Sequence, residues 1–238
     1  MNTLPRVGLH QQIFFLTENR DKIITVSLEP DSSVFDPYRG PPAPFQVCIT
    51  VGKTKGAYVV YTIAAWKAVK KSMKQMSEWV NGNLQDPPES VVIQPKYKIE
   101  FSKWNDIPVI VLRDTESYAK IYLGETSITA MHEMLSMLEN IIYSYDLSVD
   151  EVNKMYLDYI QDIQNVLMLQ CKGCKDQIWD HTCRNESEII KVIDSVGKAW
   201  VTKPFHAEDE MLTQRLRCEL NITCKAYTVL LLAKRSFP

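Results

Sequence analysis

A repeated apolar pattern constrains the fold of this chain more than any other feature of its sequence. The stretch from Phe45 to Val80 returns without a gap 62 residues later, as Ile107 to Ile142. Two copies of about 60 residues predict duplicated small domains, since a stacked solenoid needs three or more units. The coinciding positions are Val47, Ile49, Val59 and Tyr61 with Val109, Val111, Ile121 and Leu123, and then Trp66, Val69, Met73, Met76, Trp79 and Val80 with Ile128, Met131, Leu135, Leu138, Ile141 and Ile142.

The first copy is expected to contain four strands followed by one helix. Short runs rich in β-branched and aromatic residues predict the strands, and Thr62 is a suitable N-cap for the helix. Apolar residues then recur at helical spacing until Asn81-Gly82, a pair that ends helices. The predicted strands are Ile13 to Leu16, Lys22 to Leu28, Phe45 to Val51 and Ala57 to Tyr61.

The second copy repeats this order of elements, with strands expected at Val91 to Gln94, Tyr97 to Phe101, Ile107 to Arg113 and Tyr118 to Leu123. Its helix is expected to end near Tyr143. A capping box at Ser148-Val-Asp-Glu151 then predicts a new helix to about Leu169. The fold class is therefore α+β, with a first ββββα module at residues 1–83, a second at 84–145 and a mostly helical C-terminal domain at 146–238.

The duplicated unit resembles the single-stranded-DNA-binding domain of the eukaryotic transcriptional positive cofactor family. In the first copy Tyr58-Val-Val-Tyr-Thr62 matches the last strand and helix cap of that family, and Trp66 stands where the family also has a tryptophan. In the second copy Lys120-Ile-Tyr-Leu123 matches the strand, and Ile128 replaces the tryptophan. The resemblance covers about Ile13 to Tyr143. It implies two modules paired through their helices, with an exposed curved sheet that binds unpaired nucleic acid.

Strand alternation identifies the residues that such a surface would use. In the second copy it directs Tyr97, Ile99, Phe101, Ala119, Ile121 and Leu123 toward the helix and leaves Lys98, Glu100, Tyr118, Lys120 and Tyr122 on the open face. Basic groups beside aromatic rings suit phosphate contact combined with base stacking. Lys103 and Trp104 at the following turn, and Arg113 near a strand end, are expected to extend this surface.

The first copy offers a less basic face. Its expected open side carries Ile23, Thr25, Tyr58 and Val60, flanked by Lys53 and Lys55. The candidate nucleic-acid-binding residues of the whole chain are therefore Lys53, Lys55, Tyr58, Lys98, Lys103, Trp104, Arg113, Tyr118, Lys120 and Tyr122. Exposed aromatic residues on a half-covered sheet are about as common in protein interfaces as in nucleic-acid-binding surfaces, so both interpretations stay open.

Cysteines near the C-terminal end form the strongest local chemical signal. Cys171-Lys-Gly-Cys174 places two thiolates on one tight turn, and His181-Thr-Cys183 follows within a dozen residues. These four side chains predict a closed structural zinc site. The one-residue spacer between His181 and Cys183 is unusual for joint ligation, so Cys218, Cys224 or His206 are alternatives for one of them, and buried free thiols are the competing interpretation.

These patterns favour a non-enzymatic protein that binds single-stranded nucleic acid, as an accessory factor in replication or transcription. The sequence lacks a phosphate-binding glycine loop and a nucleophile elbow. It also lacks a signal-peptide pattern and any apolar run of membrane length, so we expect an intracellular protein of the nucleus or cytoplasm. The alternative is a protein-interaction or assembly factor with a structural zinc site. In either case the C-terminal domain is expected to mediate self-association or partner binding.

Overall fold

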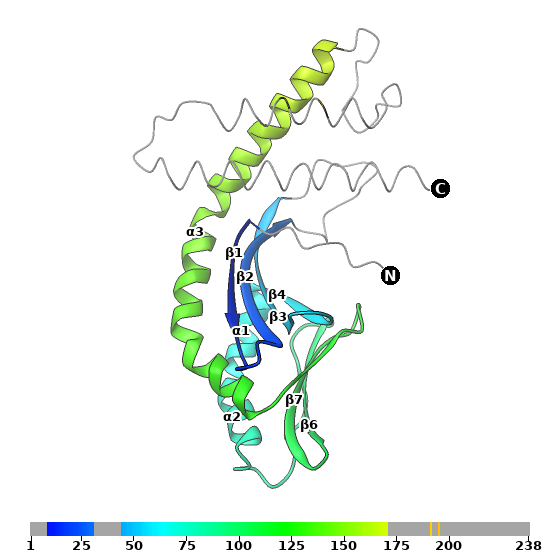
Figure 1. Ribbon diagram of the computed structural model, residues 1–238, viewed down its shortest axis with the longest axis vertical. Coiled ribbons are helices and arrows are strands. Elements are labelled where there is room, and N and C mark those ends of the chain that lie inside the picture. The colour runs from blue at the N-terminus through cyan, green and yellow to red at the C-terminus, as the bar shows by residue number, and fades with distance from the viewer. Residues whose placement is uncertain (1–8, 31–43, 171–190, 192–194, 196–238) are drawn as a thin grey trace, which may run out of the picture. The chain divides into compact units, whose positions relative to one another are not determined.

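The computed structural model describes residues 9–30, 44–170, 191 and 195. These residues form two four-stranded antiparallel sheets together with the helices α1, α2 and α3 (Figure 1). The predicted α+β class is therefore confirmed for this part of the chain. The predicted helical C-terminal domain lies mostly outside the described residues.

The first sheet has the strand order β1-β2-β3-β4. Its strands are β1 (Leu9–Phe15), β2 (Lys22–Pro30), β3 (Phe45–Lys53) and β4 (Tyr58–Thr62). The chain passes directly from β4 into α1 (Ile63–Lys71), where the Thr62 side chain accepts a hydrogen bond from the Ala65 N–H. The predicted N-cap is thus confirmed, because this bond satisfies one of the free donors in the first turn.

A short break divides the predicted first helix into α1 and α2 (Met73–Val80). At the break the Ser72 hydroxyl lies 3.3 Å from the Ala68 carbonyl oxygen, in a back-bonded arrangement that bends helices. The end of α2 agrees with the sequence, because Asn81 caps it and Gly82 follows with a positive φ of 73°.

The second sheet has the order β5-β6-β7-β8, with β5 (Val91–Val92), β6 (Tyr97–Trp104), β7 (Ile107–Asp114) and β8 (Lys120–Leu123). Asn105 and Asp106, both with positive φ, form the tight turn between β6 and β7. A two-residue turn of this kind matches the twist of the strands it joins and places Trp104 directly opposite Ile107.

Helix α3 (Glu125–Gln170) is continuous, so the predicted helix end near Tyr143 and the new start at Ser148 are wrong. Beyond Ser148, the α3 residues Asn153 and Tyr156 contact Phe45, the first residue of β3. The Asn153 amide accepts a hydrogen bond from the Phe45 N–H at 2.6 Å and donates one to the Phe45 carbonyl at 3.0 Å, while the Tyr156 ring lies edge-on to the Phe45 ring. No helix within the described ranges is both long and apolar enough to cross a bilayer.

The repeat needs a one-residue gap that the sequence comparison missed. In the first sheet Ile49 faces Tyr61 across the ladder, whereas in the second sheet Leu123, the counterpart of Tyr61, faces Ile110 rather than Val111. Residues of β3 therefore correspond to residues 61 positions later in β7, while the following strand and helix keep the spacing of 62. Because β7 is apolar on both faces, its pattern alone does not determine the register.

The second sheet and most of the first belong to one compact unit, which comprises Gln11–Leu28 and Gln46–Leu147. Within it α2, from the first copy, packs on β7 of the second sheet, and β4 lies beside β7 and β8. The buried Trp79 of α2 donates its indole N–H toward the carbonyl oxygens of Ser102 and Val109, each 3.2 Å away. The helices of the two copies also meet through an ion pair between Lys70 and Glu139.

The central strands of the first sheet are buried on both faces, so Thr25 of the expected open side is covered, whereas Ile23, Tyr58 and Val60 of that side are half-buried. Residues Ile24–Leu28 of β2 are all buried, and Thr25 is only 1% exposed. Thr50 of β3 lies on the same face as its cross-strand partner Val60 and is also buried. Consecutive residues of a strand point to opposite faces, so uninterrupted burial means that both faces are covered.

Replacing Trp79 tests the packing of α2 on the second sheet. We expect Trp79→Phe to lower the free energy of unfolding by about 1 to 3 kcal/mol, because two buried carbonyl groups lose a donor and the smaller ring leaves space. Urea unfolding followed by circular dichroism measures the change. The matched variant Trp104→Phe, at an exposed position, should stay within about 0.5 kcal/mol of the parent protein. Equal effects of the two variants would contradict this role of Trp79.

Tyr61 gives a second prediction. Its ring is fully buried and its hydroxyl has no hydrogen-bond partner among the described residues. Burial raises the pKa of Tyr61 well above its ordinary value of 10.0. Above pH 10, roughly, the unfolded chain loses this proton while the folded chain keeps it, so the free energy of unfolding falls with rising pH. We expect Tyr61→Phe to remove part of this alkaline loss, with stability near neutral pH unchanged or raised by up to about 1 kcal/mol. Urea titrations at neutral and alkaline pH measure both effects, and an unchanged alkaline slope would contradict the prediction.

Candidate nucleic-acid interface

The face of the second sheet that points away from α2 carries half of the candidate binding residues, five of the ten. The predicted alternation is confirmed within the strands, because Tyr97, Ile99, Phe101, Ile121 and Leu123 are buried, while Ala119, expected on the same side, precedes β8 and is half-buried. Cross-strand partners share a face, so the register identifies the residues on the other side. These are Lys98, Glu100, Ser102 and Trp104 of β6, Ile107, Val109, Val111 and Arg113 of β7, and Lys120 and Tyr122 of β8. Val109 and Val111 in the middle of β7 are buried, so the exposed part of this face, called the open face below, lies along β6, β8 and the ends of β7.

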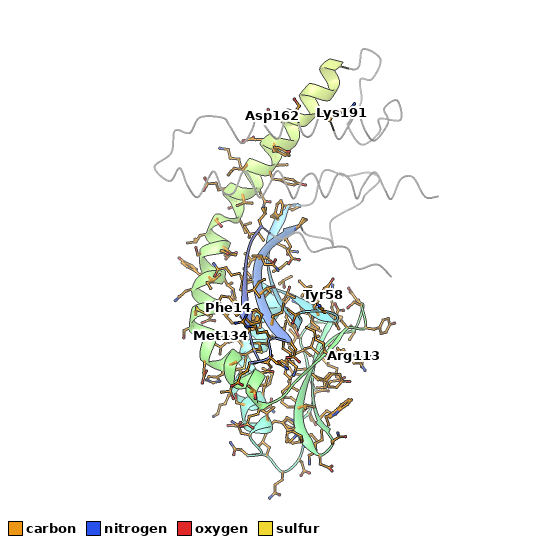
Figure 2. The ribbon with its side chains drawn as sticks, in the orientation of Figure 1. Phe14, Tyr58, Arg113, Met134, Asp162 and Lys191 are labelled. Carbon is orange, nitrogen blue, oxygen red and sulfur yellow. The ribbon has the colours of Figure 1, made fainter. Side chains whose placement is uncertain are left out.

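Three basic residues form a row across this face. Lys98 pairs with Arg113 across the ladder, and Arg113 pairs with Lys120 (Arg113 is labelled in Figure 2). Neighbouring strands lie about 4.8 Å apart, so the three side chains start from adjacent points of the sheet. A row of this kind can contact phosphate groups along a nucleic-acid backbone.

Glu100 lies among these cations. Its Oε1 atom is 3.2 Å from Lys98 Nζ and 3.5 Å from Arg113 Nη1. All three side chains are partly exposed, so the ion pairs add little stability, typically less than about 1 kcal/mol each. They do hold the two cations over the sheet. With Lys120 included, the face keeps an excess of positive charge.

Two aromatic residues lie toward the other end of the same face. The rings of Trp104 and Tyr122 meet nearly edge-on, with 5.6 Å between their centroids and 68° between their planes. Because Trp104 is on β6 and Tyr122 on β8, this contact spans β7. Trp104 is nevertheless 60% exposed and Tyr122 is 39% exposed. Ile107, the cross-strand partner of Trp104, is 64% exposed and extends the apolar area.

Two further candidates of the second copy lie elsewhere. Lys103 is on the opposite face of β6, where its ammonium group lies 5.8 Å from the centroid of the Trp79 ring. Tyr118 precedes β8 in a left-handed turn, with φ of 58°, and is 76% exposed. The buried Asp114 holds this turn, because its carboxylate accepts hydrogen bonds from the N–H groups of Glu116 and Ser117. Neither residue belongs to the row or the aromatic pair.

The candidates of the first copy are on the other sheet. Lys53 ends β3 and Lys55 lies in the following turn, and both are exposed. Tyr58, labelled in Figure 2, is the first residue of β4, is half-buried and pairs with Gly52 across the ladder. A Cβ atom on Gly52 would lie 2.5 Å from the Tyr58 Cβ, so this close approach requires glycine. The structure therefore does not place these three residues on the face that carries Arg113.

The role of Glu100 as the shared partner of Lys98 and Arg113 was not predicted. Alternation placed Glu100 on the open face, but only the β6–β7 register shows that Arg113 lies close enough to share its carboxylate. The position of Ile107 opposite Trp104 was predictable from the sequence, since a two-residue Asn-Asp turn places the flanking residues opposite each other.

The predicted zinc ligands Cys171, Cys174, His181 and Cys183, with the alternatives Cys218, Cys224 and His206, lie outside the described residues. Across residues 9–30 and 44–170 the structure shows no group of His, Cys, Asp or Glu side chains suited to a metal ion.

Comparison of the chain with protein-family models, with curated proteins and with solved structures finds no match.

Proposed function

We propose that this protein binds single-stranded nucleic acid through the open face of the β5–β8 sheet and catalyses no reaction. The observation that carries the proposal is the combination of the basic row Lys98, Arg113 and Lys120 with the exposed pair Trp104 and Tyr122 on one sheet face. The basic groups would contact phosphates, and the rings would stack on bases, which are accessible in this way only in unpaired strands.

The spacing of the two groups suits a short stretch of extended strand. Trp104 and Lys98 are six residues apart on β6, which corresponds to about 20 Å at roughly 3.3 Å per residue. A bound strand would run along β6, with one base over the aromatic pair and the phosphates of nucleotides further along the strand near the basic row. The resemblance to the transcriptional positive cofactor family supports the same ligand, and a role in replication or transcription, in the nucleus or cytoplasm, follows as part of the proposal.

A second function has an observation of its own. Ile107 and Trp104 are adjacent, apolar and mostly exposed, which is typical of a protein-binding surface. In this alternative the sheet face binds a protein partner and the protein acts in assembly or regulation. Salt dependence distinguishes the two, because phosphate contacts release counterions and apolar contacts do not.

Titration of a fluorescent single-stranded oligonucleotide tests the main proposal. At about 50 mM salt we expect micromolar or tighter binding, which weakens markedly at about 200 mM salt. Fluorescence anisotropy gives both dissociation constants. An absence of binding at the lower salt concentration would exclude the proposed function and favour the protein-binding alternative.

Paired substitutions locate the site. The double variant Lys120→Glu with Trp104→Ala should weaken binding at least about tenfold, because one stacking contact is worth roughly 1 to 3 kcal/mol and a phosphate contact is also lost. The control Lys53→Glu with Tyr58→Ala likewise changes one lysine and one aromatic residue, on the first sheet, and should have a smaller effect. Circular dichroism confirms that each variant is folded. Unchanged affinity of the first variant would place the site elsewhere.

We also propose a structural zinc ion bound by Cys171, Cys174, His181 and Cys183, in a C-terminal region that mediates self-association or partner binding. Protein purified without chelators should contain about one equivalent of zinc by elemental analysis. Replacing Cys171 and Cys174 together by serine should abolish it, whereas Cys48→Ala, at a buried cysteine of the first sheet, should not. Less than about half an equivalent in the parent protein would argue against a closed site.

A further inference from the structure

A carboxylate on the proposed phosphate-binding surface would weaken nucleic-acid binding unless it makes a favourable contact of its own with the ligand. Glu100 pairs with two of the three cations in the basic row and would repel the backbone of a nucleic acid. Both of these pairs use the Oε1 atom. A carboxylate has about four acceptor positions, so Glu100 retains acceptor capacity while it holds Lys98 and Arg113.

The position of Glu100 relative to Tyr122 is the second observation. Glu100 pairs with Val111 across the ladder, and Val111 pairs with Tyr122, so the three residues form one row across the sheet. The Cα atoms of Glu100 and Tyr122 are thus separated by two strand spacings, about 10 Å. A base stacked against Tyr122 would present its edge to Glu100 and to the cations beside it.

The edges of the four bases differ in how they suit this arrangement. Guanine offers two adjacent donors, N1–H and the N2 amino group, followed by the O6 acceptor. A carboxylate accepts from the two donors, and a lysine or arginine beside it donates to O6. Adenine and cytosine each place a ring-nitrogen acceptor next to their amino group, and thymine flanks its single N–H with two carbonyl oxygens. Each of those acceptors would face the carboxylate unfavourably.

We infer that the open face contains a guanine-selective subsite, in which Tyr122 stacks on the base, Glu100 accepts from N1–H and N2–H, and Lys98 or Arg113 donates to O6. The inference rests on the proposed binding of single-stranded nucleic acid and specifies its preferred base. Unpaired bases are read on these edges in single strands, where the Watson–Crick positions are free.

A set of oligonucleotides tests the preference directly. Each is a thymine strand of about twelve nucleotides, within the roughly 4 to 16 nucleotides that a single-strand-binding domain occupies, with one central guanine, adenine, cytosine or hypoxanthine. The guanine strand should bind at least about fivefold more tightly than the adenine and all-thymine strands, the lower end of what one bidentate base contact provides. Hypoxanthine keeps N1–H and O6 but lacks the N2 amino group, and it should fall between them.

Glu100→Gln gives a sharper test because its two expected effects have opposite signs. The variant should lose the guanine preference, since the neutral amide offers one acceptor oxygen and a competing donor. It should also bind the all-thymine strand more tightly and with a steeper salt dependence, because two cations lose their intramolecular partner. The control Glu133→Gln removes a charge from an exposed position of α3 and should leave the guanine preference unchanged.

The outcomes separate the two proposals. If no strand binds at low salt, the proposed function itself fails. If all strands bind equally, or if folded Glu100→Gln retains the guanine preference, the protein binds single strands but the subsite does not exist. A higher affinity of Glu100→Gln for every strand, with the guanine preference intact, would show that Glu100 only weakens phosphate contact.

Discussion

The packing of α2 on the second sheet joins the two copies of the repeat and determines which face of that sheet is exposed. Trp79 comes from the first copy of the repeat, yet its indole N–H is directed at backbone carbonyls of β6 and β7 in the second copy. A buried indole that is hydrogen-bonded in this way ties the two copies into one core rather than two. Helix α2 also covers one face of the second sheet, and the basic and aromatic residues lie on the other face.

The sequence predicted the elements of this core well because their patterns are local. Thr62 at the start of α1 and Gly82 after α2 are residues with specific backbone roles, and both were recognised from type and position alone. The continuity of α3 was not predictable in the same way. Ser148 and Glu151 form a suitable capping box, but the contacts of Asn153 and Tyr156 with Phe45, more than 100 positions earlier in the chain, favour an unbroken helix. Such tertiary contacts override a local stop signal.

The candidate site was predictable in its residue types but not in its arrangement. Alternation along β6 correctly separated Lys98 and Glu100 from the buried Tyr97 and Ile99. Register is a different matter, because the apolar residues on both faces of β7 leave the pairing undetermined until the Asn105-Asp106 turn fixes it. The position of Arg113 between Lys98 and Lys120 therefore follows only once Asn105-Asp106 is recognised as a two-residue turn, and the ungapped alignment of the two copies differs from the observed register by one residue in β7.

The two copies differ most in what their sheets leave exposed. Continuous burial along β2 and β3 means that these strands of the first sheet serve as core. The second sheet has the open face. Duplication therefore does not produce a symmetric platform here: one copy supplies the scaffold, and the other supplies a single surface where cations, a carboxylate and two aromatic rings meet. An asymmetric surface of this kind can distinguish among ligands, because its charged and aromatic groups occupy fixed and different positions along the strands.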